Sequence, residues 1–262
     1  MSEDFSAIDP MRAAQKNMRP NVLGRFYKVA DVAPVAGGFA LQLDGRGART
    51  PAKNALAFPT RAVAELVAKE WAGQGATIDP ANMPATRIAN SAIDGVAAAM
   101  AETRAELAAY AETDLLYYRA GAPEKLVAAQ AEAYDPVLDW AHEAFGVRFI
   151  LAEGIIHVRQ PERSLAAIRA ALEAVDEPLS LAALHVMTTL TGSVLLALAV
   201  FRGAFSAAAA WRIAHVDEDF QISQWGEDDE AMARRAARWR DVEAAAAMAA
   251  AAGGPVPASP AP

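Results

Sequence analysis

The chain has 262 residues, no cysteine and a formal net charge of −8. Without cysteine, disulfide bonds and thiolate chemistry are excluded, and the acidic balance disfavours a nucleic-acid partner. Hydrophobic residues make up 54% of the chain, many of them alanine, so the sequence favours helices and is long enough to bury a core in two domains.

We expect residues 1–18 to form a flexible leader and residues 249–262 a disordered tail. The leader carries early acids and no apolar stretch, which is typical of neither a secretory signal nor a mitochondrial presequence. The tail consists of alanine, glycine, proline and serine, a composition that does not build a packed core.

Residues 19–95 carry strand signals and then a helix. Phe39, Leu41 and Leu43 alternate with smaller or polar residues, and Asp44-Gly45 is a strong hairpin signal. Thr60 is a good N-cap for the helix that follows. We therefore expect a β-rich N-terminal domain, a small antiparallel unit with a helix packed on it.

Residues 96–248 are predicted to be an α-helical domain, which makes the fold class α+β. Within it, residues 178–201 are apolar enough to suggest a membrane span. Thr188, Thr191 and Ser193 interrupt that run, however, and favour two consecutive buried helices. We also expect a local pair of strands within residues 148–158 and an ion pair between Asp114 and Arg119.

The sequence contains no motif that predicts chemistry. The four histidines lie well apart, and no glycine-rich phosphate loop or nucleophile elbow is present. We therefore expect no catalytic residue, no metal ligand and no bound cofactor, and the protein is predicted not to be an enzyme. A small-molecule-binding enzyme without a recognisable motif stays open as an alternative.

The segment from Asp217 to Glu230 is the most unusual part of the chain. Its first half is a helical pattern with Trp211, Ile222 and Trp225 on one side. Gly226 suits a helix end, and four acids, from Glu227 to Glu230, follow it. These acids suit the start of another helix, and they also suit a surface that contacts a basic partner.

Tryptophan is enriched at the energetic centres of interfaces, so all five tryptophans are candidate anchors. Most are expected to belong to the core. They are Trp71, Trp140, Trp211, Trp225 and Trp239.

Several segments together resemble the assembly chaperones of the α subunit of the F-type ATP synthase head. The resemblance runs in order from about residue 20 to residue 245. It rests on these groups of residues: Arg25 to Lys28; Leu43 to Arg46 with Thr50-Pro51; Glu70-Trp71 with Gln74, Ile78 and Met83-Pro84; Asp114 to Arg119 with Gln130 and Asp135-Pro136; Thr191 to Ser193; and Asp219 to Glu227.

The resemblance implies a chaperone that binds the free α subunit and shields its subunit interface until the β subunit displaces it. It also implies a cytoplasmic location for a bacterial member, the mitochondrial matrix for eukaryotic relatives, no stable membrane insertion, and a monomer when free. The candidate partner-binding residues are Asp219, Trp225, Glu227, Asp228 and Trp71. A general holdase is the other alternative.

Overall fold

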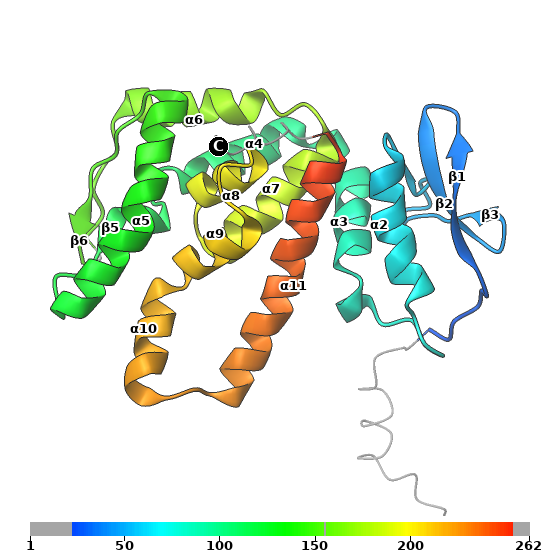
Figure 1. The fold of residues 1–262 in the computed structure, drawn as a ribbon. Coiled ribbons are helices and arrows are strands. Elements are labelled where there is room, and N and C mark those ends of the chain that lie inside the picture. The colour runs from blue at the N-terminus through cyan, green and yellow to red at the C-terminus, as the bar shows by residue number, and fades with distance from the viewer. Residues whose placement is uncertain (1–22, 155, 254–262) are drawn as a thin grey trace, which may run out of the picture.

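The computed structural model describes residues 23–154 and 156–253, and its fold is α+β as expected (Figure 1). A small antiparallel sheet comes first and helices follow. In the sheet, β2 (Gly38–Leu43) pairs with β1 (Ala30–Val35) on one side, and with β3 (Arg46–Gly47) and β4 (Ala57–Phe58) on the other.

The predicted Asp44-Gly45 hairpin is confirmed. Both residues have positive φ, 49° and 77°, as a two-residue turn of this kind requires. A different constraint acts at Gly38, where a Cβ atom would lie 2.1 Å from the carbonyl oxygen of Phe58. Only glycine therefore lets β4 approach β2 at this point.

Helix α2 (Arg61–Ala72) covers the sheet. Thr60 caps it as predicted, accepting a hydrogen bond from the backbone N–H of Val63 at 3.3 Å. Leu41 of β2 and Val67 of α2 are both fully buried in the shared core. The alternation read from the sequence therefore points the apolar face of the sheet at this helix.

Helix α3 (Pro84–Asp94) follows a short 3-10 turn, η1 (Pro80–Asn82), and packs against α2. It also packs against α7 (Pro178–Thr191) and α11 (Asp229–Ala251). In Figure 1 it lies between the sheet with its helix and the remaining helices. This helix therefore joins the β-rich and helical parts of the chain.

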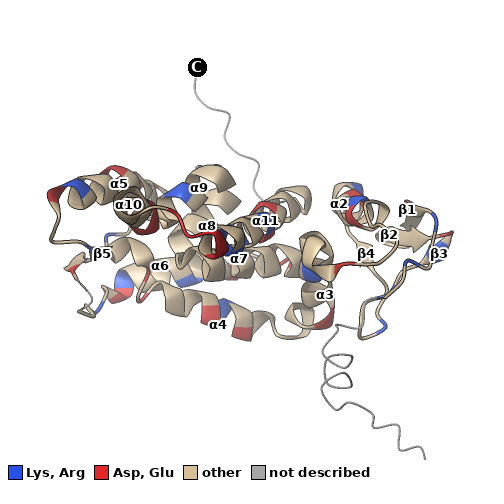
Figure 2. Cartoon of the chain, turned by 90° about the horizontal axis from the view of Figure 1, so that it is seen from below, with Lys and Arg blue, Asp and Glu red and all other residues tan. Residues whose placement is uncertain are grey.

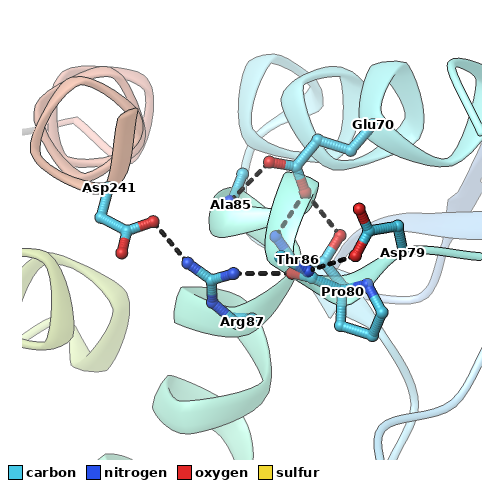
Figure 3. A network of polar contacts seen from close by, with 8 residues as sticks. Glu70, Asp79, Pro80, Ala85, Thr86, Arg87 and Asp241 are labelled. Carbon is cyan, nitrogen blue, oxygen red and sulfur yellow. Dashed lines mark hydrogen bonds and ion pairs between the residues drawn. The ribbon is translucent and has the colours of Figure 1, made fainter. Parts of the chain in front are cut away.

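Polar side-chain contacts fix the position of the first turn of α3 (Figure 3). The Glu70 carboxylate accepts hydrogen bonds from the backbone N–H groups of Ala85 and Thr86 at 2.6 and 2.7 Å, and from the Thr86 hydroxyl at 2.7 Å. Arg87 donates to the carbonyl of Pro80 and forms an ion pair with Asp241 of α11. Burial raises the pKa of Glu70, and these hydrogen bonds oppose that rise.

The remaining helical elements complete the helical part of the chain. They are η2 (Val96–Ala98), α4 (Met100–Tyr110), η3 (Leu115–Tyr117), α5 (Glu124–Phe145), α6 (Glu162–Glu173), α8 (Val194–Phe201), α9 (Ala207–Ala214) and α10 (Val216–Trp225). Two short strands, β5 (Tyr118–Arg119) and β6 (Ala152–Glu153), form a separate parallel pair.

The apolar run at residues 178–201 folds as two buried helices, as predicted. Helix α7 ends at Gly192, which adopts φ 71°, and the Ser193 hydroxyl caps α8. Asp114 is fully buried and accepts a hydrogen bond from the N–H of Leu195, which lies in the first turn of α8. Among the described helices, none combines the length and the apolar character that crossing a membrane requires.

Some local predictions were wrong. The expected strand pair within residues 148–158 does not form among the described residues, because β6 instead pairs with β5. Arg119 forms its ion pair with Asp135, at 2.7 Å, rather than with Asp114. Helix α11 runs to Ala251, so its last turn lies in the segment expected to be a tail. The expected leader, and the tail from residue 254, lie outside the described residues.

Candidate functional site

Residues 216–235 form an arm that extends from the helical part of the chain (Figure 1). The arm consists of α10, the turn after it and the first part of α11. The helical pattern predicted across this region breaks at His215, so Trp211 and Trp225 lie on two different helices. Trp211 is buried in the core, whereas Trp225 is 80% exposed.

Polar contacts hold α10, which contains no buried residue. The Gln130 amide of α5 donates to the carboxylate of Asp217 at 2.6 Å. Arg235 of α11 forms an ion pair with Asp219 and approaches Glu218 to 4.0 Å. Only partly buried apolar side chains such as Val216 anchor α10 to the core, so these polar contacts help to fix its position.

The tip of the arm presents a tryptophan beside acidic side chains. Gly226 has φ 89°, which ends α10 and turns the chain toward α11. Trp225 and Glu227 flank this glycine, and both are exposed. The carboxylate of Asp228 is partly committed to structure, since it caps α11 by accepting from the N–H of Ala231 at 2.7 Å.

The acidic charge of the arm is not balanced within its first fifteen residues. Residues 216–230 contain seven acidic side chains and no cationic one. The nearest arginines along the chain follow later in α11. Figure 2, which views the molecule from the side of the arm, shows acidic residues on α10 and on the turn. The resulting negative potential favours a basic partner surface.

His215 joins the arm to the core. Its ring lies against Trp211, with ring centroids 3.9 Å apart, and its Nδ1 atom lies 2.8 Å from the carbonyl oxygen of Trp211. Burial lowers the pKa of His215, an effect that Glu218 and Asp219 oppose. The residue therefore acts as a packed hinge between α9 and α10.

A groove of about 480 Å³ runs between α5, α9 and α10. Its apolar side chains are half-buried, which leaves room for apolar groups of another molecule. The side chains that matter for recognition are Phe205, Ile213, Val216 and Phe220, with Glu132, Arg212 and Asp219 as charged members.

The structure thus brings four of the five sequence candidates together. Asp219, Trp225, Glu227 and Asp228 all lie on the arm. Trp71 instead lies in α2, where its ring packs against Tyr27 at a centroid distance of 5.5 Å.

Sequence reasoning missed Arg235 and the groove. Arg235 stands among four arginines of α11, and nothing in the sequence singles it out. The groove joins residues about 90 positions apart, a contact that only the fold reveals. Within residues 23–154 and 156–253, no cluster of three or more His, Cys, Asp or Glu side chains could hold a metal ion.

Comparison with known proteins places this geometry in a family. A sequence model described as ATP12 chaperone protein matches residues 24–142. The Atu1473 protein of Agrobacterium tumefaciens is 46% identical, with 94% of this chain and 92% of that chain covered and a TM-score of 0.85. The chain belongs to the ATP12 chaperone family.

Two structures of Atp12 from another bacterium are also similar to this chain. Atp12 from Paracoccus denitrificans is 41% identical, covers 88% of this chain and 98% of that one, and has a TM-score of 0.81; a point variant of the same protein gives the same values. The expected membership of the ATP synthase assembly chaperones is therefore confirmed. The ATP12 sequence model ends before the arm, which only the longer structural alignments can cover.

Several residues that carried the resemblance have structural roles in this member of the ATP12 chaperone family. Glu70 caps α3, and the Gln74 side chain accepts from the N–H of Asp79 at 2.7 Å while donating to the Glu70 carbonyl at 3.0 Å. Gln130 holds the arm through Asp217 and also accepts from the N–H of Ala120. The family signature therefore combines residues that build the fold with residues of the arm.

Proposed function

We propose that this protein captures the free α subunit of the F-type ATP synthase head and shields its subunit interface until the β subunit displaces it. The capture is passive binding without catalysis, in the bacterial cytoplasm, by a chaperone that is monomeric when free. The observation that carries the proposal is the exposed Trp225, set among acids at the tip of a projecting arm.

The arm suits a client that is released again. An unassembled subunit exposes apolar interface and aggregates unless that surface is covered. Trp225 supplies an aromatic anchor, and the groove beside α10 accepts apolar side chains. Glu227 and its neighbours attract Lys or Arg of the client, and such exposed charge pairs speed association more than they tighten the complex. The β subunit can therefore compete for the same surface.

The direct test is co-expression with the α subunit of the same organism, followed by size-exclusion chromatography with and without added β subunit. A soluble one-to-one complex that releases the α subunit when β is added is the expected result. Failure to form a complex would refute the proposal. Equal protection of an unrelated aggregating client, such as citrate synthase at elevated temperature, would identify a general holdase instead.

Charge reversal at the tip tests whether the arm is the contact surface. Glu227→Lys is expected to weaken capture of the α subunit without changing the far-UV circular dichroism spectrum. Glu173→Lys is the matched control, because Glu173 is an exposed acid at the end of α6. Equal effects of the two variants would show that net charge, rather than the arm, governs capture.

A further inference from the structure

A pocket of about 500 Å³ lies on the β-rich part of the chain. Its aromatic wall is formed by Phe26, Tyr27 and Trp71, and its cationic side by Arg46 and Arg49. The β2–β3 turn places Arg46 at this edge of the sheet. Trp71, the sequence candidate that does not lie on the arm, therefore lines a second concave surface.

This surface is positively charged although the chain as a whole is acidic. Residues 23–60 contain five cationic and two acidic side chains, a net charge of +3, against −8 for the whole chain. Figure 2 shows the Lys and Arg positions around β3 on this side of the molecule. The arm and the sheet thus present opposite charges to a partner.

The one acidic group in the pocket wall is held by backbone N–H groups and forms no ion pair with the pocket's arginines. The Asp44 carboxylate accepts hydrogen bonds from the backbone N–H groups of Lys28 and Val29, at 3.0 and 2.8 Å, and these bonds lower its pKa. Among the residues that the structure describes, neither Arg46 nor Arg49 forms an ion pair with a carboxylate. Arg49 donates from one Nη atom to the carbonyl of Lys53 at 2.7 Å, which leaves the rest of its guanidinium group, like that of Arg46, able to bind an external anion.

Exposed apolar side chains occur along the chain segment that supplies Phe26 and Tyr27 to the pocket. Phe26 is 63% exposed and lies edge-on to Tyr27, with ring centroids 5.3 Å apart. Leu23 and Val29, on the same segment, are 59% and 53% exposed. Three large exposed apolar side chains within residues 23–29 are a feature that interaction sites often have.

We propose that this pocket binds an acidic segment of a partner polypeptide in which a carboxylate stands next to an aromatic or aliphatic side chain. The carboxylate pairs with Arg46 and Arg49, and the apolar side chain packs on Phe26 and Tyr27. The volume suits a short peptide segment, since ligand pockets span about 300–1,000 Å³. This binding goes beyond capture by the arm, which selects basic segments.

A peptide titration tests the proposal on the full-length chain. The probe is a fluorescein-labelled peptide, acetyl-Asp-Phe-Glu-Leu-Asp-Phe-Glu-amide, and its control carries Asn and Gln in place of the acids. Saturable binding of the acidic peptide, at least about tenfold tighter than that of the amide control, is the expected result. Equal affinity for the two peptides would overturn the proposal.

Variants locate the binding. The double variant Arg46→Glu/Arg49→Glu is expected to abolish binding, and Arg46→Gln/Arg49→Gln to weaken it about tenfold or more. Arg163→Glu, at an exposed position in α6, is the control for a cation-to-acid change elsewhere. Unchanged affinity in both pocket variants would refute the site, as would equally tight binding of double-stranded DNA or anionic lipid vesicles.

Indole N–H resonances separate this proposal from the one made for the arm. The chain has five tryptophans, which single Trp→Phe variants assign. The acidic peptide is expected to shift the Trp71 resonance and leave that of Trp225 in place. A shift of Trp225 alone would place the peptide on the arm and contradict the pocket, whereas capture of the α subunit is tested without this peptide.

Discussion

Arg235 and Asp219 form an ion pair that joins α11 to α10 across the arm. The Arg235 side chain is only 14% exposed, and the Glu218 carboxylate lies 4.0 Å from it. The hydrogen bond to Asp219 and the charges of both acids raise the pKa of Arg235. Asp219 therefore positions the arm in addition to being available at its surface.

Breaking this pair is predicted to loosen α10 without unfolding the protein. In Asp219→Arg, two guanidinium groups face each other where a pair had been. Global stability should fall by only about 1 kcal/mol, because partly exposed ion pairs contribute little. Amide hydrogen exchange in α10 should accelerate much more, since this helix has no fully buried side chain and depends on polar contacts for its position.

The charge swap decides between positioning and direct contact. Asp219→Arg/Arg235→Asp restores the ion pair with its polarity reversed. If Asp219 acts by positioning, the double variant recovers slow exchange in α10 and most of the capture of the α subunit. Recovered exchange without recovered capture would instead assign Asp219 to the contact itself.

Trp225 is predicted to matter for the client and not for the fold. Because its side chain is 80% exposed, Trp225→Ala should change the free energy of unfolding by less than about 0.5 kcal/mol. A tryptophan at the centre of an interface contributes about 2 kcal/mol or more, so capture of the α subunit should weaken by about 30-fold. Calorimetric titration measures the loss, and Trp140→Ala, which removes a core contact with Phe145, should show the reverse pattern.

Local signals explain what the sequence could predict. The Asp44-Gly45 turn, the Thr60 cap and the division of residues 178–201 each follow from a few neighbouring residues. The acids near Trp225 were likewise recognised as one segment, and the fold keeps them together on the arm.

Long-range pairings explain what it could not. The partner of Arg119 was misassigned because Asp114 is nearer in the sequence, whereas the fold buries Asp114 against α8 and brings Asp135 to Arg119. The break at His215 was missed because the helical pattern continues across it. Nothing local in the sequence distinguishes Arg235 from its neighbouring arginines.

Glu70 is predicted to stabilise the junction between the two parts of the chain. Glu70→Ala removes the acceptor of three hydrogen bonds at the start of α3. Partly buried donors left without a partner should lower the free energy of unfolding by about 2–3 kcal/mol. Urea denaturation measures this loss. Glu65→Ala, on the exposed side of the same helix, loses only an ion pair with Arg61 and should cost no more than about 0.5 kcal/mol.

The buried Asp114 is predicted to make stability fall as the pH rises from about 4 to 6. Burial raises its pKa to about 6 in the folded chain, although the N–H groups of Leu116 and Leu195 each donate to it at 3.1 Å. In the unfolded chain an aspartate has a pKa of about 3.9. Between these two values the folded state binds more protons, so raising the pH through this window favours unfolding.

Comparison with Asp114→Asn isolates this contribution, because asparagine does not titrate and all other groups cancel. The stability of the natural chain relative to this variant should fall by about 2 kcal/mol between pH 4 and pH 7, since the two pKa values differ by about 2 units. Asp94→Asn should show the opposite sign. Hydrogen bonds from Thr50 and Asn54 lower the pKa of Asp94, so its contribution is present above about pH 4 and is lost as the pH falls further. If the stability of the natural chain relative to Asp114→Asn instead rises with pH, the fold stabilises the ionised carboxylate of Asp114, and the prediction is wrong.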